Sequence, residues 1–452
     1  MQSFTKFVVT AAACAALGVA AGDADFFKAA DANQDGYITR DELRGAMTQW
    51  LGGRERIDQK QLTDALNAAF PEGTFMKMIS PPQSKTPKLA DQQKMEAALP
   101  ESAPAKPLRA RKVLVFCNAA GFVHSSIPLA AKTVEELGSK TGAWTTDVSY
   151  DPAVITTENL KQYDLIFLDS TTGYFLDDAD AAVTAARKKA LLSFVRSGKG
   201  LAGIHAASDS YHRATDGPEI GGMIATGMLG AADKDGDKTL DAAELSGLAD
   251  KWFDTADAGH AGKVSVADFK AGFGRILFST RPPRPAGGAR PTPPAAKPGP
   301  DHQEGTWPEF NKMIGGYFKF HWVYPQHIVY KIDDPNSPLT AMFKDGFAVN
   351  DETYTFAEKS WSRENVHVLT SIDYSKMSDE DKAKEDYPRA DHDYGLSWIK
   401  RDGKGRVFYM AHGHAEEIYA NKQMLAHLLA GIQYALGDLK ADDRPSAKEK
   451  GM

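Results

Sequence analysis

Cysteine is almost absent from this sequence, and its scarcity excludes two kinds of site. Only Cys14 and Cys117 occur among the 452 residues, and Cys14 lies in a segment that we expect to be removed. A mature chain with one cysteine forms no internal disulfide and offers no thiolate cluster to zinc. Because Cys117 falls in an apolar strand pattern, we expect it to be a buried, structural thiol.

Excess positive charge and long apolar runs are lacking as well. The formal net charge is -7 at pH 7, which argues against a nucleic-acid partner. The apolar run at residues 7–19 is too short and too rich in alanine to span a membrane. It follows Lys6 and ends in small residues, which is typical of a signal peptide, here residues 1–21. We therefore expect an exported protein, periplasmic or extracellular; a lipoprotein anchor at Cys14 is disfavoured because Ala11 suits a lipobox poorly.

Residues 31–42, DANQDGYITRDE, form a complete EF-hand loop. Oxygen-bearing residues stand at the calcium-ligand positions, and Gly36 permits the sharp turn. The expected ligands are Asp31, Asn33, Asp35, the Tyr37 carbonyl, Thr39 and Glu42. A second loop ending at Gln61 lacks the early acidic ligands but keeps Ile57 for pairing. We predict an N-terminal EF-hand pair at residues 22–79 that binds one calcium ion.

A second calcium loop, residues 233–244, interrupts the later sequence. The expected ligands are Asp233, Asp235, Asp237, the Thr239 carbonyl, Asp241 and Glu244. Its sixth position is Lys238, where glycine is usual, so a lysine must adopt a positive φ. The following loop, residues 257–268, has Gly259 and Ala261 where oxygen ligands belong, and we expect it to be empty or weak. We predict an inserted EF-hand pair at residues 219–280, followed by a Pro-rich linker at 281–305.

Short apolar runs alternate with helical patterns on both sides of this insertion. Strands are expected at residues 111–118, 145–149, 164–169 and 201–204, and the pattern resumes at Trp307. Such alternation predicts an α/β fold with a doubly wound, flavodoxin-like sheet. The predicted α/β domain covers residues 111–218 and 306–440, after a linker at 80–110 and before a disordered tail at 441–452.

Histidines follow three of the predicted strands. His124, His205 and His414 each stand just beyond one, and the carboxyl ends of parallel strands share one crevice. Each histidine alone is compatible with a structural role. Together they suit zinc or another divalent transition metal, or general acid–base chemistry. The candidates for substrate binding around them are His321, Asp209, Glu352 and Glu416.

Several stretches resemble the trehalose-utilisation (ThuA-like) family: GIHAASDSY, GGYF, VNDETYTF and GRVFYMAHGHAEEIY. The resemblance covers about residues 112–211 and 307–437, and it implies a class I glutamine-amidotransferase-like fold. In that superfamily a nucleophilic cysteine lies in a Gly-x-Cys-x-Gly turn. His205 takes its place here, which excludes Cys-dependent glutamine hydrolysis at this position. The final motif leads us to favour His414 over His412, and the family's link to disaccharides and keto-sugars implies a carbohydrate substrate.

Two functions of different class are compatible with this sequence. In the first, an exported enzyme binds a metal or moves protons through its histidines beside a sugar; isomerase, lyase and hydrolase chemistry all fit. In the second, a calcium-dependent module binds a glycan, or a protein partner through the EF-hand pairs, without turnover. A bound transition metal that is lost in His205→Ala would favour the enzyme.

Overall fold

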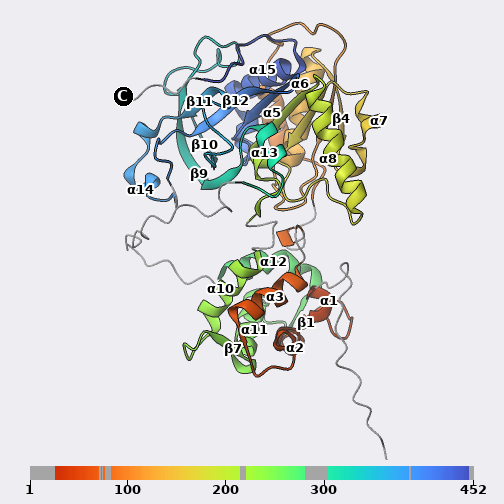
Figure 1. Cartoon of the computed structure of the whole chain (residues 1–452), viewed down its shortest axis with the longest axis vertical. Helices are drawn as coiled ribbons and strands as arrows, with labels where there is room; N and C mark the ends of the chain where they lie inside the picture. The colour runs from red at the N-terminus through yellow and green to blue at the C-terminus, as the bar shows by residue number, and fades with distance from the viewer. Residues whose placement is uncertain are drawn as a thin grey trace, which may run out of the picture.

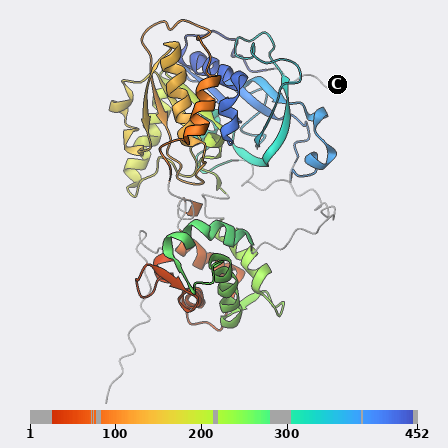
Figure 2. The same ribbon diagram turned by 180° about the vertical axis from the view of Figure 1, so that it is seen from behind.

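The structure is a computed structural model and describes residues 26–70, 73, 75–76, 83–213, 220–279, 304–385 and 388–446. The predicted signal peptide and nearly all of the Pro-rich linker lie outside these residues. Figure 1 shows two lobes: an α/β lobe around a large sheet, and a smaller helical lobe beside it. Figure 2 gives the view from behind.

Nine strands form one sheet in the described part of the α/β lobe, in the order β10-β9-β11-β12-β13-β6-β5-β3-β4. The parallel strands are β3 (Lys112–Phe116), β4 (Thr145–Ser149), β5 (Leu165–Asp169), β6 (Gly200–Ile204) and β13 (Gly405–Met410). The antiparallel strands are β9 (Phe318–Ile332), β10 (Ala348–Phe356), β11 (His367–Ile372) and β12 (Gly395–Asp402). Counted in chain order, the parallel strands lie 2-1-3-4-5. This is the flavodoxin-like order, so the predicted fold class is confirmed.

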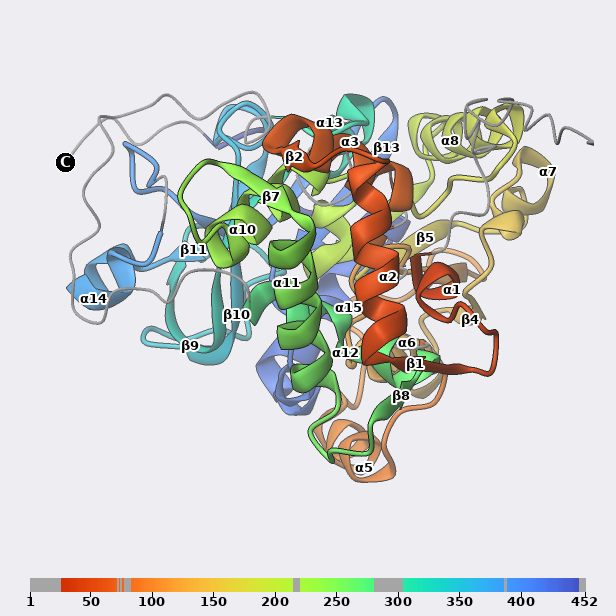
Figure 3. The ribbon, with the colours of Figure 1, turned by 90° about the horizontal axis from the view of Figure 1, so that it is seen from below.

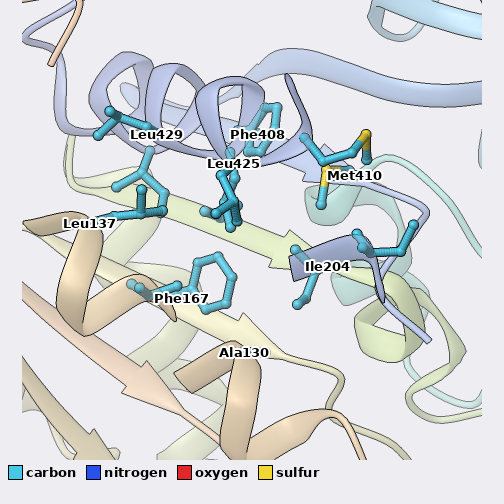
Figure 4. Close-up of a cluster of buried hydrophobic side chains, with 14 of the residues drawn as sticks. Ala130, Leu137, Phe167, Ile204, Phe408, Met410, Leu425 and Leu429 are labelled. Atoms are coloured by element: carbon cyan, nitrogen blue, oxygen red, sulfur yellow. The ribbon is translucent and has the colours of Figure 1, made fainter. Parts of the chain in front are cut away.

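Helices cover both faces of the sheet because its parallel strands are apolar on both sides. Phe167 and Ile204 face α6 and α15 (Figure 4), whereas Ile166 and Leu201 share the opposite core with α8 and α13. The helices of this lobe are α5 (Leu89–Ala98), α6 (Ile127–Thr141), α7 (Thr157–Leu160), α8 (Ala181–Arg196), α13 (Pro308–Ile314), α14 (Asp379–Lys382) and α15 (Lys422–Leu436). None of the helices in the described ranges is both long and apolar enough to cross a bilayer.

One core holds the helical lobe together, and both the N-terminal segment and the insertion contribute to it. Its helices are α1 (Phe26–Ala30), α2 (Arg40–Thr48), α3 (Gln59–Ala69), α10 (Ile220–Ala232), α11 (Ala242–Ala256) and α12 (Val266–Ser279); its strands are β1 (Tyr37–Thr39), β2 (Arg56–Asp58), β7 (Thr239–Asp241) and β8 (Lys263–Ser265). Helices α2 and α11 run side by side (Figure 3), joined by Arg44 and Asp250 at 2.7 Å. Phe273 of α12 packs against Phe26 and Phe27. The lobe is therefore a single unit built from two distant segments.

The EF-hand loops pair across these segments. Strand β1 pairs with β8, which sets Ile38 opposite Val264, and β2 pairs with β7, which sets Ile57 opposite Leu240. The first loop thus partners the fourth, and the second partners the third. The prediction of one self-contained pair in each segment is wrong. All four facing residues are aliphatic, so either arrangement satisfies the contact between loops, and the shared core decides between them.

Two segments that were predicted to be irregular pack on the α/β lobe. Residues 83–110 contain α5, whose Met95 is fully buried, and the amide of Gln433 bonds both backbone groups of Ala105. The predicted linker is therefore wrong over these residues, because specific contacts fix a segment whose composition favours disorder. The predicted tail is ordered as far as residue 446, where Ser446 donates its backbone N–H to Val366.

Candidate metal centre

Three histidines from separate loops meet at the carboxyl edge of the parallel strands. His124 follows β3, His205 follows β6 directly, and His414 follows β13. The ring centroids of His124 and His205 are 4.7 Å apart, and that of His414 lies 5.2 Å and 5.3 Å from them. The convergence expected from the sheet topology is present.

A sharp turn and one hydrogen bond orient His205. Its φ of +44° lies in the left-handed region that few residues other than glycine adopt. Its Nδ1 lies 3.0 Å from the carbonyl oxygen of Ala411, and since a carbonyl only accepts, Nδ1 carries the ring proton. The lone pair is then on Nε2, which lies 3.1 Å from Nε2 of His124. A hydrogen bond of this kind fixes the tautomer of a metal-binding imidazole.

A carboxylate from the antiparallel end of the sheet joins the histidines. Oε2 of Glu352 lies 3.3 Å from Nε2 of His205 and 3.2 Å from Nδ1 of His414, and Oε1 lies 2.9 Å from Nδ1 of His321. One ligand atom from each of His124, His205, Glu352 and His414 lies within 4.8 Å of the others. The side chain of His414 is 28% exposed and that of His321 36%, whereas His124 and His205 are buried. The cluster is therefore accessible from the side of His414 and His321.

An irregularity between β9 and β10 brings Glu352 to this place. Asp351 pairs with Gln326 but Thr353 pairs with Trp322, so three residues of β9 stand opposite Glu352 alone. The alternation of sides is broken, and Asp351 and Glu352 are both buried. Bulges of this kind redirect side chains next to functional sites.

Asp351 holds the loop that carries His414. Its Oδ2 accepts the backbone N–H groups of Gly413 at 2.7 Å and His414 at 3.3 Å, and Oδ1 accepts that of Ala415 at 2.9 Å. Gly413 has a φ of +139°, and a Cβ there would lie 2.8 Å from the hydroxyl of Tyr419. The loop therefore requires glycine, and its backbone is fixed by a buried carboxylate.

Burial and hydrogen bonds set the charges of the cluster. Burial acts to raise the pKa of Glu352, but its close contacts with the rings of His205, His321 and His414 hold that pKa far below its usual range. Burial lowers the pKa of His414, but the hydrogen bond and charge of Glu352 outweigh it and raise the pKa. Burial, with the charges of His205 and His414, holds the pKa of His124 well below its ordinary value. Glu352 is therefore held as an anion and His124 as a neutral imidazole, the forms in which they bind metals, whereas the raised pKa of His414 means that a metal would have to displace its proton.

Two of the predicted substrate-binding residues lie near the cluster without being part of it. Oδ1 of Asp209 is 3.6 Å from Nδ1 of His212. Burial first and the charge of Asp209 second raise the pKa of Tyr354, whose ring packs on the histidines. Glu416 accepts a hydrogen bond from Ser125 at 2.9 Å. Their roles in binding stay predictions.

His412 and Asp351 illustrate what the sequence did and did not reveal. His412 points into the core, where its ring nitrogens bond the hydroxyls of Tyr330 and Thr353, in keeping with the preference for His414. The part played by Asp351 in holding the loop of His414 was missed. Its one signal is the adjacent pair Asp351-Glu352 inside an apolar strand, where two successive buried carboxylates indicate a bulge.

Two exposed aromatic rings border the cluster. Phe122 is 47% exposed, and its ring centroid lies 4.8 Å from that of His124. Tyr324 is 39% exposed and stacks on His414 at 6.1 Å. Exposed apolar groups beside a polar cluster are typical of a ligand-binding surface.

The two loops predicted to bind calcium, residues 31–42 and 233–244, have matching backbone shapes. Their fourth and sixth positions are left-handed: φ is 60° at Gln34 and 85° at Gly36 in the first loop, and 77° at Gly236 and 65° at Lys238 in the third. The positive φ expected for Lys238 is therefore present. In the third loop, ligand oxygens of Asp233, Asp235 and Asp237 lie within 4.8 Å of one another. Oxygen donors in these positions suit calcium rather than a softer metal.

Comparison with known proteins supports the α/β lobe and the first loop. The family model for trehalose utilisation (ThuA) matches residues 112–260 and 299–435, and an EF-hand model matches residues 24–47. A ThuA-like protein of Bacteroides uniformis is 16% identical, with 75% of this chain and 96% of that chain covered and a TM-score of 0.41. One of Parabacteroides merdae is 13% identical, with the same coverage and a TM-score of 0.40. No curated protein matches the chain.

Proposed function

This chain belongs to the trehalose-utilisation (ThuA) family, and from that premise we propose that it is an exported, calcium-binding enzyme of carbohydrate processing. A divalent transition metal would be held at the carboxyl edge of the sheet. Its ligands would be His124, His205, Glu352 and His414. Disaccharides and keto-sugars are the substrates proposed.

The spacing of the ligand atoms carries this proposal. Around a tetrahedral ion with bonds of about 2.1 Å, neighbouring ligand atoms stand about 3.4 Å apart. Nε2 of His205 lies 3.1 Å from Nε2 of His124 and 3.3 Å from Oε2 of Glu352, which lies 3.2 Å from Nδ1 of His414. The residues therefore fit one shared ion. Nitrogen-rich ligand sets favour zinc and related transition metals, whereas calcium favours oxygen.

The ion, when bound, would supply Lewis-acid polarisation of a sugar carbonyl or hydroxyl. Around it the protein's own residues would orient the substrate and move protons. His321 contacts Glu352 through Nδ1 and is 36% exposed, so it is accessible to a substrate as an acid or base. Isomerase, lyase and hydrolase chemistry each need such a proton carrier, and the site is compatible with all three.

The exposed rings of Phe122 and Tyr324 support a carbohydrate as the substrate. Both lie against a ligand histidine, His124 and His414 respectively. A sugar presents C–H groups on one face and hydroxyls at its edge, so it complements a surface that combines flat apolar rings with polar groups. Glu416 and Ser125, joined by a hydrogen bond, supply such polar groups nearby.

Metal analysis of the purified protein tests the proposal. We expect one transition-metal ion per chain in the unaltered protein, and none in His205→Ala. The matched control is His327→Ala, a histidine of β9 that is exposed and bonded to Asn350. Disaccharides and keto-disaccharides should be turned over by the loaded protein and by the control only. Full metal content in His205→Ala would refute the shared ion.

A second function is favoured by the same exposed rings, which could hold a glycan without chemistry. A calcium-dependent binding module, for a glycan or for a protein at the EF-hand lobe, would bind with no turnover in any metal state. Binding of a disaccharide by the metal-loaded protein, with no product formed, would support it. Export is tested separately: the secreted chain should begin near Gly22.

A further inference from the structure

One arginine lies among the predicted calcium ligands of the third loop. The guanidinium of Arg56, in β2, contacts Asp235 at 3.1 Å and Asp241 at 3.8 Å, and it also bonds Asp237. These aspartates stand at the third, ninth and fifth ligand positions of the loop. The same oxygens that would bind calcium therefore already hold a positive charge, and it comes from the other chain segment.

The first loop provides an internal comparison. In the two loop pairs, Arg56 stands opposite Asp241 and Lys263 stands opposite Thr39, so both cations occupy the same register position. The ammonium of Lys263 lies instead over the ring of Tyr37, 4.0 Å from its centroid. The difference is therefore not imposed by the pairing of the strands, because equivalent positions direct their charges to different partners.

We infer that Arg56 is a built-in competitor of calcium at the third loop. This inference rests on the calcium binding proposed above. It means that the first loop takes up calcium directly, whereas the third loop must first release the guanidinium of Arg56. The planar fork of arginine bridges two carboxylates at once, which a lysine does less well. The third loop is thereby held in shape by a side chain, and its apparent affinity for calcium is lowered.

The contacts of Arg56 with the third loop also join the N-terminal segment to the insertion when calcium is scarce. Arg56 belongs to the N-terminal segment, whereas all of its carboxylate partners belong to the insertion. Calcium at the third loop would remove this tie while binding oxygens of the insertion alone. The arginine thus favours the assembled lobe, and calcium at that loop competes with it.

Calorimetric titration of the full-length protein with calcium chloride tests the inference. We expect one tight site in the unaltered protein, lost in Glu42→Gln, and a third-loop site that is at least about tenfold weaker. Arg56→Met should strengthen that second site by about tenfold or more, in line with the loss of one nearby charge. Glu244→Gln should abolish the gain. The control Lys263→Met should leave the third loop unchanged.

The outcomes separate this inference from the proposal of calcium binding. One result would support the inference and contradict calcium binding at the first loop. In it, the unaltered protein binds no calcium, but Arg56→Met gains a site that depends on Glu244. Two equally tight sites in the unaltered protein would overturn the inference. So would an Arg56→Met protein that keeps its helical circular-dichroism signal but gains no affinity.

Discussion

Asp351 accepts the backbone N–H of Gly413 at 2.7 Å, although one residue lies on the edge strand β10 and the other follows β13 inside the sheet. The neighbour of Asp351 is the ligand candidate Glu352, and the neighbour of Gly413 is His414. One buried carboxylate therefore holds two of the four proposed ligands in a fixed relation.

Replacing Asp351 should weaken metal binding without removing a ligand. Asp351→Ala leaves three backbone N–H groups without their acceptor, so the loop of His414 loses its position. We expect metal affinity to fall by about 10- to 100-fold, as for other residues that orient ligands. Competition with a chromophoric chelator measures this. Asp345→Ala, at an exposed turn, should behave as the unaltered protein; equal affinities in both variants would contradict the role.

The exposed rings should affect substrate binding more than chemistry. Phe122→Ala and Tyr324→Ala each remove a flat apolar surface beside the cluster. We expect KM for the disaccharide to rise about tenfold, or roughly 1.4 kcal/mol, with kcat changed little because neither ring belongs to the proposed metal ligands. Leu108→Ala, which removes a 74% exposed side chain elsewhere, is the control. An unchanged KM in both ring variants would argue against a sugar-binding surface here.

Removal of the insertion should damage the N-terminal segment and spare the α/β lobe. Without residues 220–279, the side chains of Phe26 and Phe27 lose Phe273 and the core shared with it. We expect that chain to bind a hydrophobic dye and to associate, and that removal of residues 26–76 as well restores a monomer. Size-exclusion chromatography and near-UV circular dichroism distinguish these states. Protected N-terminal helices in the first variant would contradict pairing across the segments.

One buried histidine should make the α/β lobe sensitive to acid. His427 bonds the carbonyl of Leu339 at 2.6 Å, and burial lowers its pKa to about 4. Since its pKa in the unfolded chain is about 6.5, the unfolded state binds the proton first as the pH falls. The stability is complete above about pH 6.5 and is lost as the pH falls towards 4, by about 2 kcal/mol at pH 5.

His427→Gln should remove this part of the pH dependence. Its amide can still donate to Leu339, but it does not titrate. Urea unfolding at pH 7 and at pH 5 gives the free energy of unfolding for both proteins. The difference in the free energy of unfolding between the unaltered protein and His427→Gln should change by about 2 kcal/mol between pH 7 and pH 5. A constant difference would mean that the pKa of His427 is the same in the folded and unfolded states.

Local patterns predicted the sheet well because each buried parallel strand is marked by its own residues. Val113 to Phe116 and Leu165 to Leu168 are continuous apolar runs, and both form strands as expected. The convergence of His124, His205 and His414 followed from the topology alone. The sequence placed Glu352 around the histidines as a substrate-binding residue, not among the metal ligands. Its direction is set by the irregular pairing of β9 and β10 at this residue, which a regular strand pattern does not reveal.

The pairing of the EF-hand loops could not be predicted from local patterns. Ile38, Ile57, Leu240 and Val264 are interchangeable as facing residues, and nothing in any one of them selects its partner. The choice depends on aromatic contacts such as that between Phe27 and Phe273, which join helices far apart in the sequence. Likewise, the burial of Met95 depends on helices that lie outside its own segment.

The helical lobe joins a segment that precedes residues 83–213 to a segment that follows them. It therefore closes residues 83–213 into a loop without a covalent bond. While the lobe stays folded, an α/β lobe that unfolds cannot separate the two ends of this stretch. Closing a loop on the order of 100 residues removes conformational entropy worth about 5 kcal/mol when the link is covalent. Calcium bound at the first loop would strengthen such a closure, so its effect on stability would extend to strands that never contact the ion.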